Sequence, residues 1–127
     1  MFEQPKASIN VRQASDHRTY IFDIEGELTA FAEDALMVAY NQACDAGSHN
    51  LILNFEGLEY MSSSGIGLLV TLLIRAQRRQ QRLLAYGLSE HYRHILELTR
   101  LNEAIAVYPT EDEALRQARS APQPVAG

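Results

Sequence analysis

Residues 51–70 read LILNFEGLEYMSSSGIGLLV, and this stretch sets the order of the elements around it. Its first five residues, LILNF, are mostly apolar, too short for a helix and bounded by turn-forming residues, which indicates a buried strand. We expect the next segment, EGLEYM, to be a loop. From Ser64 to about Gln80 the spacing of apolar residues predicts an amphipathic helix. The positions that recur at helical spacing are Ile66, Leu69, Val70, Leu73, Ile74 and Gln77, with Leu68 and Leu72 widening the apolar side.

Two strands are predicted near the N-terminus. SINVRQ (8–13) and TYIFDIEG (19–26) show the patterns of strands. In the second of them, Tyr20, Phe22 and Ile24 alternate with Ile21, Asp23 and Glu25, which is the pattern of a half-buried strand. The small polar residues at 15–17 suit a turn between the two strands. We expect Gly26 to end the second strand.

A helix is predicted between these strands and the LILNF strand. It runs from about Ala30 to Asp45, because Thr29 suits the N-cap position and Gly47 suits the stop. The positions of its expected apolar face are Phe31, Ala35, Val38 or Ala39, and Gln42 or Ala43.

Further strands and helices alternate after the central helix. Ser89 suits the N-cap of one helix, and Thr110 followed by Glu113 is a capping-box pattern that opens the last helix. The predicted elements are strands at 82–87 and 104–108, and helices at 91–101 and from 111 to about 118.

This order predicts an α/β fold in which a mixed sheet of four to five strands carries about four helices. Strands separated by a single helix should be parallel neighbours, whereas the N-terminal hairpin makes the first strand an antiparallel edge. We assign residues 1–117 to one domain. Residues 118–127 include two prolines and show no periodicity, so we expect a disordered C-terminal tail.

The composition is that of one ordinary soluble domain. The chain has 127 residues, 46% of them hydrophobic and 21% charged, and its single cysteine, Cys44, cannot form an internal disulfide. A net charge of −5 argues against non-specific binding to nucleic acid. No apolar run reaches the roughly 20 residues that span a membrane, and the N-terminus lacks the apolar core of a signal peptide. We therefore expect a cytoplasmic protein without membrane insertion or a nucleic-acid partner.

Several kinds of chemistry use a run of serines before a helix. An α/β-hydrolase needs a glycine two residues on either side of its nucleophile, but Met61 stands two residues before Ser63. A P-loop needs Gly-Lys followed by Ser or Thr, and the only lysine is Lys6. His91 and His94 could share a helix face, but no further ligands follow at zinc-site spacing. The sequence thus predicts no catalytic residue, no cofactor and no metal, in a protein that is not an enzyme.

Helix capping explains one of the three hydroxyls, since one N-cap needs one side chain. An exposed hydroxyl at a helix N-terminus also suits phosphorylation, because a phosphate of roughly −1.5 to −2 charges would lie in the favourable field of the helix dipole. Gly65 and Gly67 remove side-chain cover from the first turns, which should leave the serines accessible. A surface that changes its charge without unfolding suits a switch for a binding partner.

The stretch from 51 to 70 resembles the signature of STAS domains of the bacterial anti-sigma factor antagonist type. In that family a buried strand leads through a short loop into an Asp-Ser-Ser-Gly or Asp-Ser-Thr-Gly turn, followed by an aliphatic residue and a helix. The resemblance covers roughly residues 8–117. Other matching segments are IFDIEGEL (21–28) for the second strand, RLLAYGLSEHYRHILELTRL (82–101) for the strand and helix after the site, and IAVYPTEDEAL (105–115) for the closing strand and helix.

The resemblance implies a partner-switching module that is controlled by phosphorylation. The unmodified domain would bind an anti-sigma factor or related serine protein kinase of the histidine-kinase-like ATPase class, phosphorylation would release it, and a serine phosphatase would reset the switch. The acceptor is then Ser63, with Ser64 and Ser62 as alternatives. The implied partner-binding residues are Met61, Ser62, Ser63, Ser64, Gly65, Ile66 and Gly67.

One position departs from the family pattern, because Ser62 stands where the family commonly has aspartate. This substitution removes a negative charge beside the acceptor. It gives some weight to a second hypothesis, in which the chain is a non-switching STAS subunit of a transporter or a signalling scaffold and the serines serve only as a helix cap and a turn. A homodimer is compatible with both hypotheses.

Overall fold

The computed structural model describes residues 7–120 of the chain. Within them lies one five-stranded sheet whose spatial order is the chain order, β1-β2-β3-β4-β5. β1 is antiparallel to β2, and the remaining neighbours are parallel, as expected from the helices between them. The strands are β1 (Ala7–Gln13), β2 (Thr19–Leu28), β3 (Asn50–Met61), β4 (Arg82–Tyr86) and β5 (Ala106–Tyr108).

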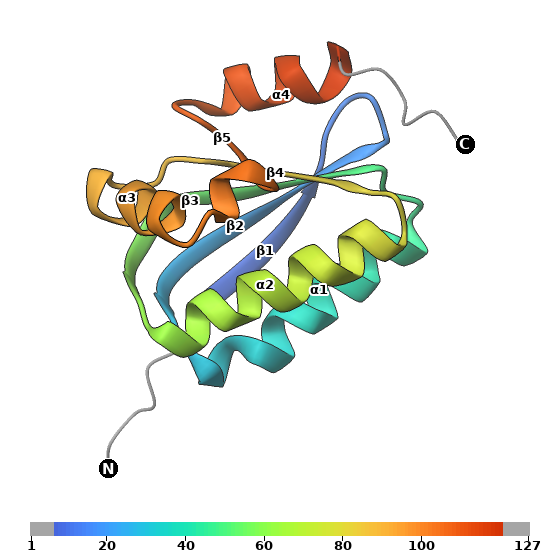
Figure 1. Cartoon of the computed structure of the whole chain (residues 1–127). Coiled ribbons are helices and arrows are strands. Elements are labelled where there is room, and N and C mark those ends of the chain that lie inside the picture. The colour runs from blue at the N-terminus through green and yellow to red at the C-terminus, as the bar shows by residue number, and fades with distance from the viewer. Residues whose placement is uncertain (1–6, 121–127) are drawn as a thin grey trace.

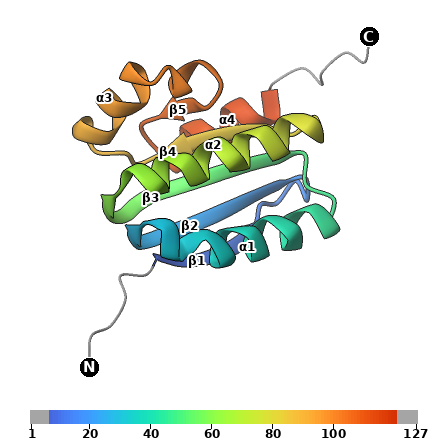
Figure 2. The ribbon, with the colours of Figure 1, turned by 60° about the horizontal axis from the view of Figure 1, so that its bottom comes forward.

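Helices cover both faces of the sheet, which confirms the predicted α/β fold (Figure 1). α1 and α2 lie side by side on one face, whereas α4 lies on the other (Figure 2). The helices are α1 (Glu33–Asp45), α2 (Ser63–Arg78), α3 (Glu90–Leu98) and α4 (Glu111–Ser120), with the short 3-10 helices η1 (Ala30–Ala32) and η2 (Leu101–Glu103). No helix in the described range is long and apolar enough to cross a membrane.

The core has two parts because successive strand side chains point to opposite faces. Phe22 and Ile24 of β2 pack on the side of α1 and α2, together with Leu96 of α3. Ile21, on the other face of β2, packs beneath α4. The cluster under α4 consists of Ile21, Ile52, Leu84, Tyr86, Ala114 and Ala118.

β2 and β3 continue beyond β4, and within the described residues their last pairs, Glu27–Leu28 with Tyr60–Met61, form a two-stranded ribbon beyond β1 as well. β4 pairs with β3 only from Asn50 to Asn54, whereas β3 pairs with β2 as far as Met61. The loop predicted for EGLEYM is therefore wrong, and Gly26 does not end β2 but lies beside a shift in the strand register. Residues 56–61 contain a glycine and two glutamates, which is the local pattern of a loop. They form a strand because they pair with β2, which is distant in the sequence.

The helix predicted at 30–45 is two elements. The Thr29 hydroxyl accepts a hydrogen bond from the Phe31 N–H at 3.3 Å and caps η1, and α1 begins only at Glu33. The tighter 3-10 turn changes the direction of the side chains that follow. Phe31 and Ala35, expected on the apolar face, are consequently exposed, and of the alternatives Val38 or Ala39 the buried one is Ala39. The residues of α1 that are buried are Leu36, Ala39, Tyr40 and Ala43.

The C-terminal helix is longer than predicted. Thr110 caps it by accepting a hydrogen bond from the Glu113 N–H at 3.2 Å, as the capping-box pattern indicated. α4 extends to Ser120, so residues 118–120 belong to the helix rather than to the expected tail. Ala118 is buried in the same cluster as Ala114, one helical turn earlier, which explains the extension. Residues 121–127 lie outside the described residues.

A polar network joins the edge strand to α4. Arg12 donates hydrogen bonds to both carboxylate oxygens of Asp23, at 2.6 and 2.8 Å, and to Glu111 at 2.6 Å. Glu111 also accepts a hydrogen bond from the Tyr86 hydroxyl at 2.9 Å. Burial raises the pKa of Asp23, but the hydrogen bonds from Arg12 and Asn54 outweigh that effect and hold the pKa below its ordinary value. The network ties the edge strand β1 to α4 across the face of the sheet that α4 covers.

Candidate functional site

The serine turn lies where the ribbon of β2 and β3 meets the start of α2. The N–H of Ser62 donates to the carbonyl oxygen of Leu28, the last residue of β2, at 3.0 Å. The N–H of Met61 donates to the hydroxyl of Tyr92, on α3, at 2.9 Å. The turn is therefore held on two sides by elements that lie far from it in the sequence.

Ser62 is the N-cap of α2. Its backbone is extended, its hydroxyl oxygen accepts a hydrogen bond from the Gly65 N–H at 3.1 Å, and its carbonyl oxygen accepts the first helical bond from Ile66 at 3.0 Å. α2 thus begins at Ser63, one residue before the predicted start. Aspartate and serine are about equally good N-caps, so the serine at position 62 caps α2 without adding a charge.

Ser63 and Ser64 occupy the first turn of α2, and both are exposed. Within residues 7–120, neither hydroxyl forms a hydrogen bond with another residue. The N–H groups of a helix's first turn have no partner inside the helix, and here only that of Gly65 is taken by the cap. The first turn therefore offers free N–H groups and the positive end of the helix dipole next to two accessible hydroxyls.

The two glycines of the motif have different roles. Gly65 is buried, and a Cβ there would clash with the carbonyl oxygen of Leu28 and lie 3.0 Å from the Cγ of Met61. At Gly67 a Cβ would meet nothing within 4 Å. Gly65 thus allows α2 to approach the end of β2, whereas Gly67 leaves the surface beside the serines bare.

The seven predicted partner-binding residues divide by accessibility. Ser63, Ser64 and Gly67 are exposed, and Ser62 and Ile66 are half-buried. Met61 and Gly65 are buried: Met61 belongs to the core and Gly65 to the packing of α2 on β2.

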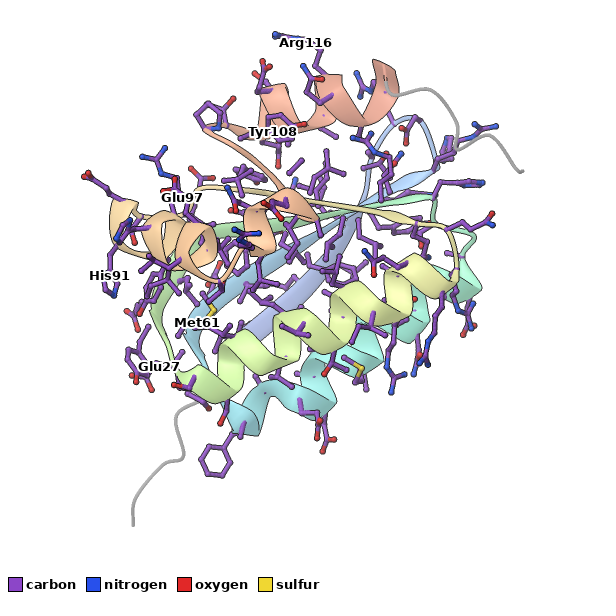
Figure 3. All side chains as sticks on the ribbon, viewed as in Figure 1. Glu27, Met61, His91, Glu97, Tyr108 and Arg116 are labelled. Atoms are coloured by element: carbon purple, nitrogen blue, oxygen red, sulfur yellow. The ribbon has the colours of Figure 1, made fainter. Side chains whose placement is uncertain are left out.

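Two exposed aromatic residues beside the turn were not predicted as part of the site. Phe31, 60% exposed, lies in η1, which packs against α2, and Tyr60, 49% exposed, lies in β3 just before the turn. Figure 3 shows Glu27, the neighbour of Tyr60 in the ribbon, at the same end of the molecule as Met61 and His91. The sequence placed Phe31 on the buried face of a helix and Tyr60 in a loop, so neither was considered for the surface.

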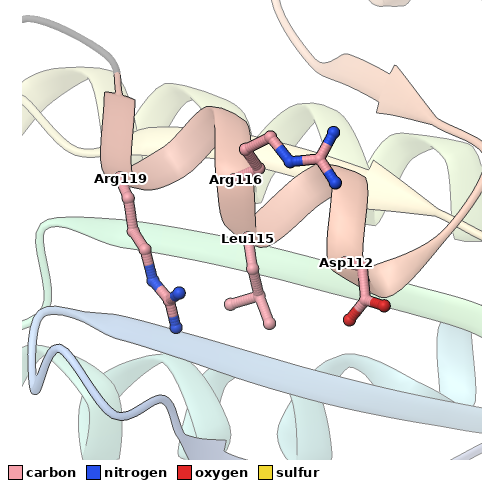
Figure 4. Close-up of a pocket in the computed structure, with 4 residues that line it drawn as sticks. All are labelled: Asp112, Leu115, Arg116 and Arg119. Carbon is pink, nitrogen blue, oxygen red and sulfur yellow. The ribbon is translucent and has the colours of Figure 1, made fainter.

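In the described part of the chain, no group of three or more His, Cys, Asp and Glu residues could hold a metal ion. A surface hollow of about 550 Å³ lies along α4, lined by Asp112, Leu115, Arg116 and Arg119 (Figure 4). Arg119 there donates to the Ser15 hydroxyl at 3.0 Å, and Leu115 packs on the cluster under α4. This hollow does not include the serine turn.

Replacing Ser62 by alanine should lower the free energy of unfolding by about 1 kcal/mol, because the Gly65 N–H loses its cap. Urea denaturation followed by circular dichroism measures the change. Ser64→Ala is the matched control and should stay within about 0.5 kcal/mol of the unmodified protein, since the Ser64 side chain is exposed. Equal stabilities of the two variants would contradict the capping role.

A family model described as the STAS domain matches residues 8–114. Among curated proteins, the anti-sigma-B factor antagonist of Staphylococcus aureus is 24% identical over 100 residues, which cover 79% of this chain and 93% of that protein.

Solved structures share the fold. SpoIIAA, an anti-sigma factor antagonist solved in its unphosphorylated form, matches with a TM-score of 0.72 and 22% identity, covering 90% of this chain and 100% of that one. SpoIIAA of Bacillus in the phosphorylated form matches with a TM-score of 0.70 and 23% identity, covering 88% of this chain and 100% of that one. A sulfate transporter family protein from Wolinella succinogenes matches with a TM-score of 0.70 and 21% identity, covering 80% of this chain and 84% of that one. At these identities the likeness establishes the fold alone.

Proposed function

The chain belongs to the STAS domain family, and we propose that it is an anti-sigma factor antagonist switched by phosphorylation of Ser63. The observation that carries the proposal is the separation of roles in the serine run. Ser62 is occupied as the N-cap, whereas Ser63 and Ser64 are exposed in the first turn of α2. Of these two, Ser63 is the acceptor in the register of the family motif. The curated relatives support the general role, because the Staphylococcus aureus protein is named an anti-sigma-B factor antagonist.

The proposed partner is an anti-sigma factor that is also a serine protein kinase of the histidine-kinase-like ATPase class. The unmodified domain binds it in the cytoplasm, and transfer of phosphate to Ser63 ends the binding. A serine phosphatase restores the hydroxyl. In this role the domain is a binding module and a substrate of the kinase rather than an enzyme.

The start of α2 can carry a phosphate without unfolding. A negative group in the first turn of a helix gains typically 0.3–1 kcal/mol from the dipole, and roughly 2 kcal/mol in favourable geometries. The free N–H groups of Ser63 and Ser64 point in the same direction as the dipole's positive end. The modification therefore changes the surface while the fold persists, as a reversible switch requires.

The contact surface is proposed to centre on Ser63 and to include two aromatic side chains. Among the described residues, Phe31 and Tyr60 are the exposed aromatic residues on the elements that adjoin the turn, and Ile66, in the first turn of α2, is half-buried. Exposed aromatic residues are common anchors of protein interfaces. A phosphate placed among them would have to lose water on binding, which opposes the complex.

Isothermal titration calorimetry of the domain against a candidate serine kinase tests the proposed function. A kinase encoded beside this gene is the first candidate. The unmodified domain should bind, and the domain phosphorylated by that kinase should bind at least about tenfold more weakly, which is 1.4 kcal/mol. Equal affinities of the two forms would overturn the switch and favour the non-switching subunit, as would transporter genes in place of kinase and phosphatase genes.

Replacing Phe31 by alanine should weaken kinase binding about tenfold or more, because an aromatic anchor at the centre of an interface typically contributes 2 kcal/mol or more. The stability of the domain should change little, since Phe31 is 60% exposed. Ile74→Ala is the matched control: Ile74 is 43% exposed on the same helix as Ser63, roughly 16 Å along its axis. Similar affinities of the Phe31 and Ile74 variants for the kinase would show that Phe31 does not belong to the contact surface.

A further inference from the structure

Within residues 7–120, the outer edge of β1 pairs with no other strand, so its outward backbone groups can bind one. The Ala14 N–H donates to the Thr19 carbonyl at 2.8 Å, so in this antiparallel ladder Ala14, Arg12, Asn10 and Ser8 direct their backbone groups toward β2. The alternate residues Ala7, Ile9, Val11 and Gln13 therefore direct theirs outward. β1 has no proline, no lysine and no irregularity of register, all of which commonly protect an edge. Its one charged side chain, Arg12, is paired with Asp23 and Glu111.

A groove with apolar residues flanks this edge on the α1 side. It has a volume of about 540 Å³ and includes Ile9 and Val11 of β1 and Val38 of α1. Val38 is 65% exposed, although it lies in the middle of α1. The apolar side chains of the groove thus lie next to the hydrogen-bonding edge. Figure 2 shows β1 at the edge of the sheet with α1 beside it, away from the start of α2, where the serine turn lies.

We propose that this surface binds a second copy of the chain, through antiparallel pairing of β1 with the partner's β1 about a two-fold axis at Asn10. In this register Ile9 lies opposite the partner's Val11, and Ala7 lies opposite the partner's Gln13. These are the residues whose backbone groups point outward, so each such pair forms two hydrogen bonds. The strand is self-complementary, because in this register the outward backbone groups of both copies form the same hydrogen bonds.

The helix layer is compatible with the same axis. α1 follows β2 through a parallel crossover and therefore runs in the direction of β1, so its middle residue, Val38, lies beside the middle of the strand. A two-fold axis there brings Val38 near the partner's Val38. Asp34 then lies opposite the partner's Gln42 rather than another carboxylate. The contact buries apolar side chains without opposing like charges.

The size of the contact predicts a weak dimer. A strand of seven residues is about 23 Å long, and a strand with a helix above it is about 20 Å high, which gives roughly 460 Å² per subunit. Specific, stable interfaces bury about 800 Å² per subunit. We therefore expect a monomer at low micromolar concentrations and a dimer at hundreds of micromolar.

Sedimentation velocity between about 5 and 500 μM tests the association, with concentrations chosen for a weak interface. The sedimentation coefficient should rise with concentration for the unmodified protein and for Ile74→Lys, whose exposed apolar residue lies on α2. Val38→Lys should remain monomeric, because it places two ammonium groups at the axis. A monomer at every concentration, or association that Val38→Lys leaves unchanged, would overturn the proposal.

Disulfide cross-linking tests the register. In a Cys44→Ser background, Asn10→Cys should oxidise to a covalent dimer, because Asn10 would face its own copy as a non-hydrogen-bonded pair with Cα atoms about 4.5 Å apart. Ser8→Cys is the control and should not, since Ser8 would lie opposite the partner's Arg12. Equal cross-linking of the two variants, or none by Asn10→Cys, would overturn the proposed pairing. Neither experiment involves the kinase, so the outcome is independent of the switch.

Discussion

Replacing Ser63 by glutamate is expected to lower the affinity for the kinase partner at least about tenfold, which is 1.4 kcal/mol. The carboxylate adds a charge at the first position of α2, within the surface that includes Phe31 and Tyr60. Burying that charge in a packed contact requires its desolvation, and truncating or mismatching a buried charge contact commonly costs 2 kcal/mol or more. The fold should persist, because a negative group at a helix N-terminus is stabilising.

Gln77→Glu is the matched control for this variant. It adds the same charge to the same helix, at an exposed position near the opposite end. Calorimetric titration of both variants against the kinase should show loss of affinity only for Ser63→Glu. If both variants bind as tightly as the unmodified protein, the serine turn does not lie in the contact, and the non-switching subunit becomes the better hypothesis.

Gly65→Ala should cause the largest loss of stability among the variants of the motif, about 2–3 kcal/mol. A Cβ at this position would clash with the Leu28 carbonyl oxygen and lie 2.9 Å from the Leu28 carbonyl carbon. The clash is with backbone, so a change of rotamer cannot relieve it. Moving α2 away would also weaken the bond from the Ser62 N–H to the Leu28 carbonyl oxygen.

Gly67→Ala provides a control of opposite sign. Open space surrounds this position within the same helix, and alanine is a better helix former than glycine by about 1 kcal/mol. Urea denaturation should therefore show a loss for Gly65→Ala and a small gain for Gly67→Ala. Equal effects of the two substitutions would contradict the packing role assigned to Gly65.

Local signals in the sequence were sufficient for the order of elements. The hairpin, the parallel crossovers and the caps at Ser89 and Thr110 follow from turn residues, short apolar runs and capping patterns, and all are present in the structure. Features that depend on distant contacts were not predictable in the same way. Residues 56–61 form a strand only because β2 lies beside them, and the faces of α1 shift because a 3-10 turn precedes it.

The candidate site shows the same division. The sequence predicted the strand, the turn and the helix after it, and it predicted that one serine caps this helix. The identity of the cap follows from contacts across the fold, since the Ser62 N–H bonds to Leu28 while its hydroxyl accepts from Gly65. The network of Arg12, Asp23 and Glu111 joins positions 11 and 99 residues apart, and no local pattern indicates it.

Locating the phosphate by mass spectrometry, after incubation of the domain with a kinase that binds it and with ATP, tests the central claim most directly. The modification should lie on Ser63, disappear in Ser63→Ala and persist in Ser62→Ala, whose substitution removes a cap and not the acceptor. Phosphate on Ser62 or Ser64, or no modification by such a kinase, would contradict the assignment of Ser63 as the switch.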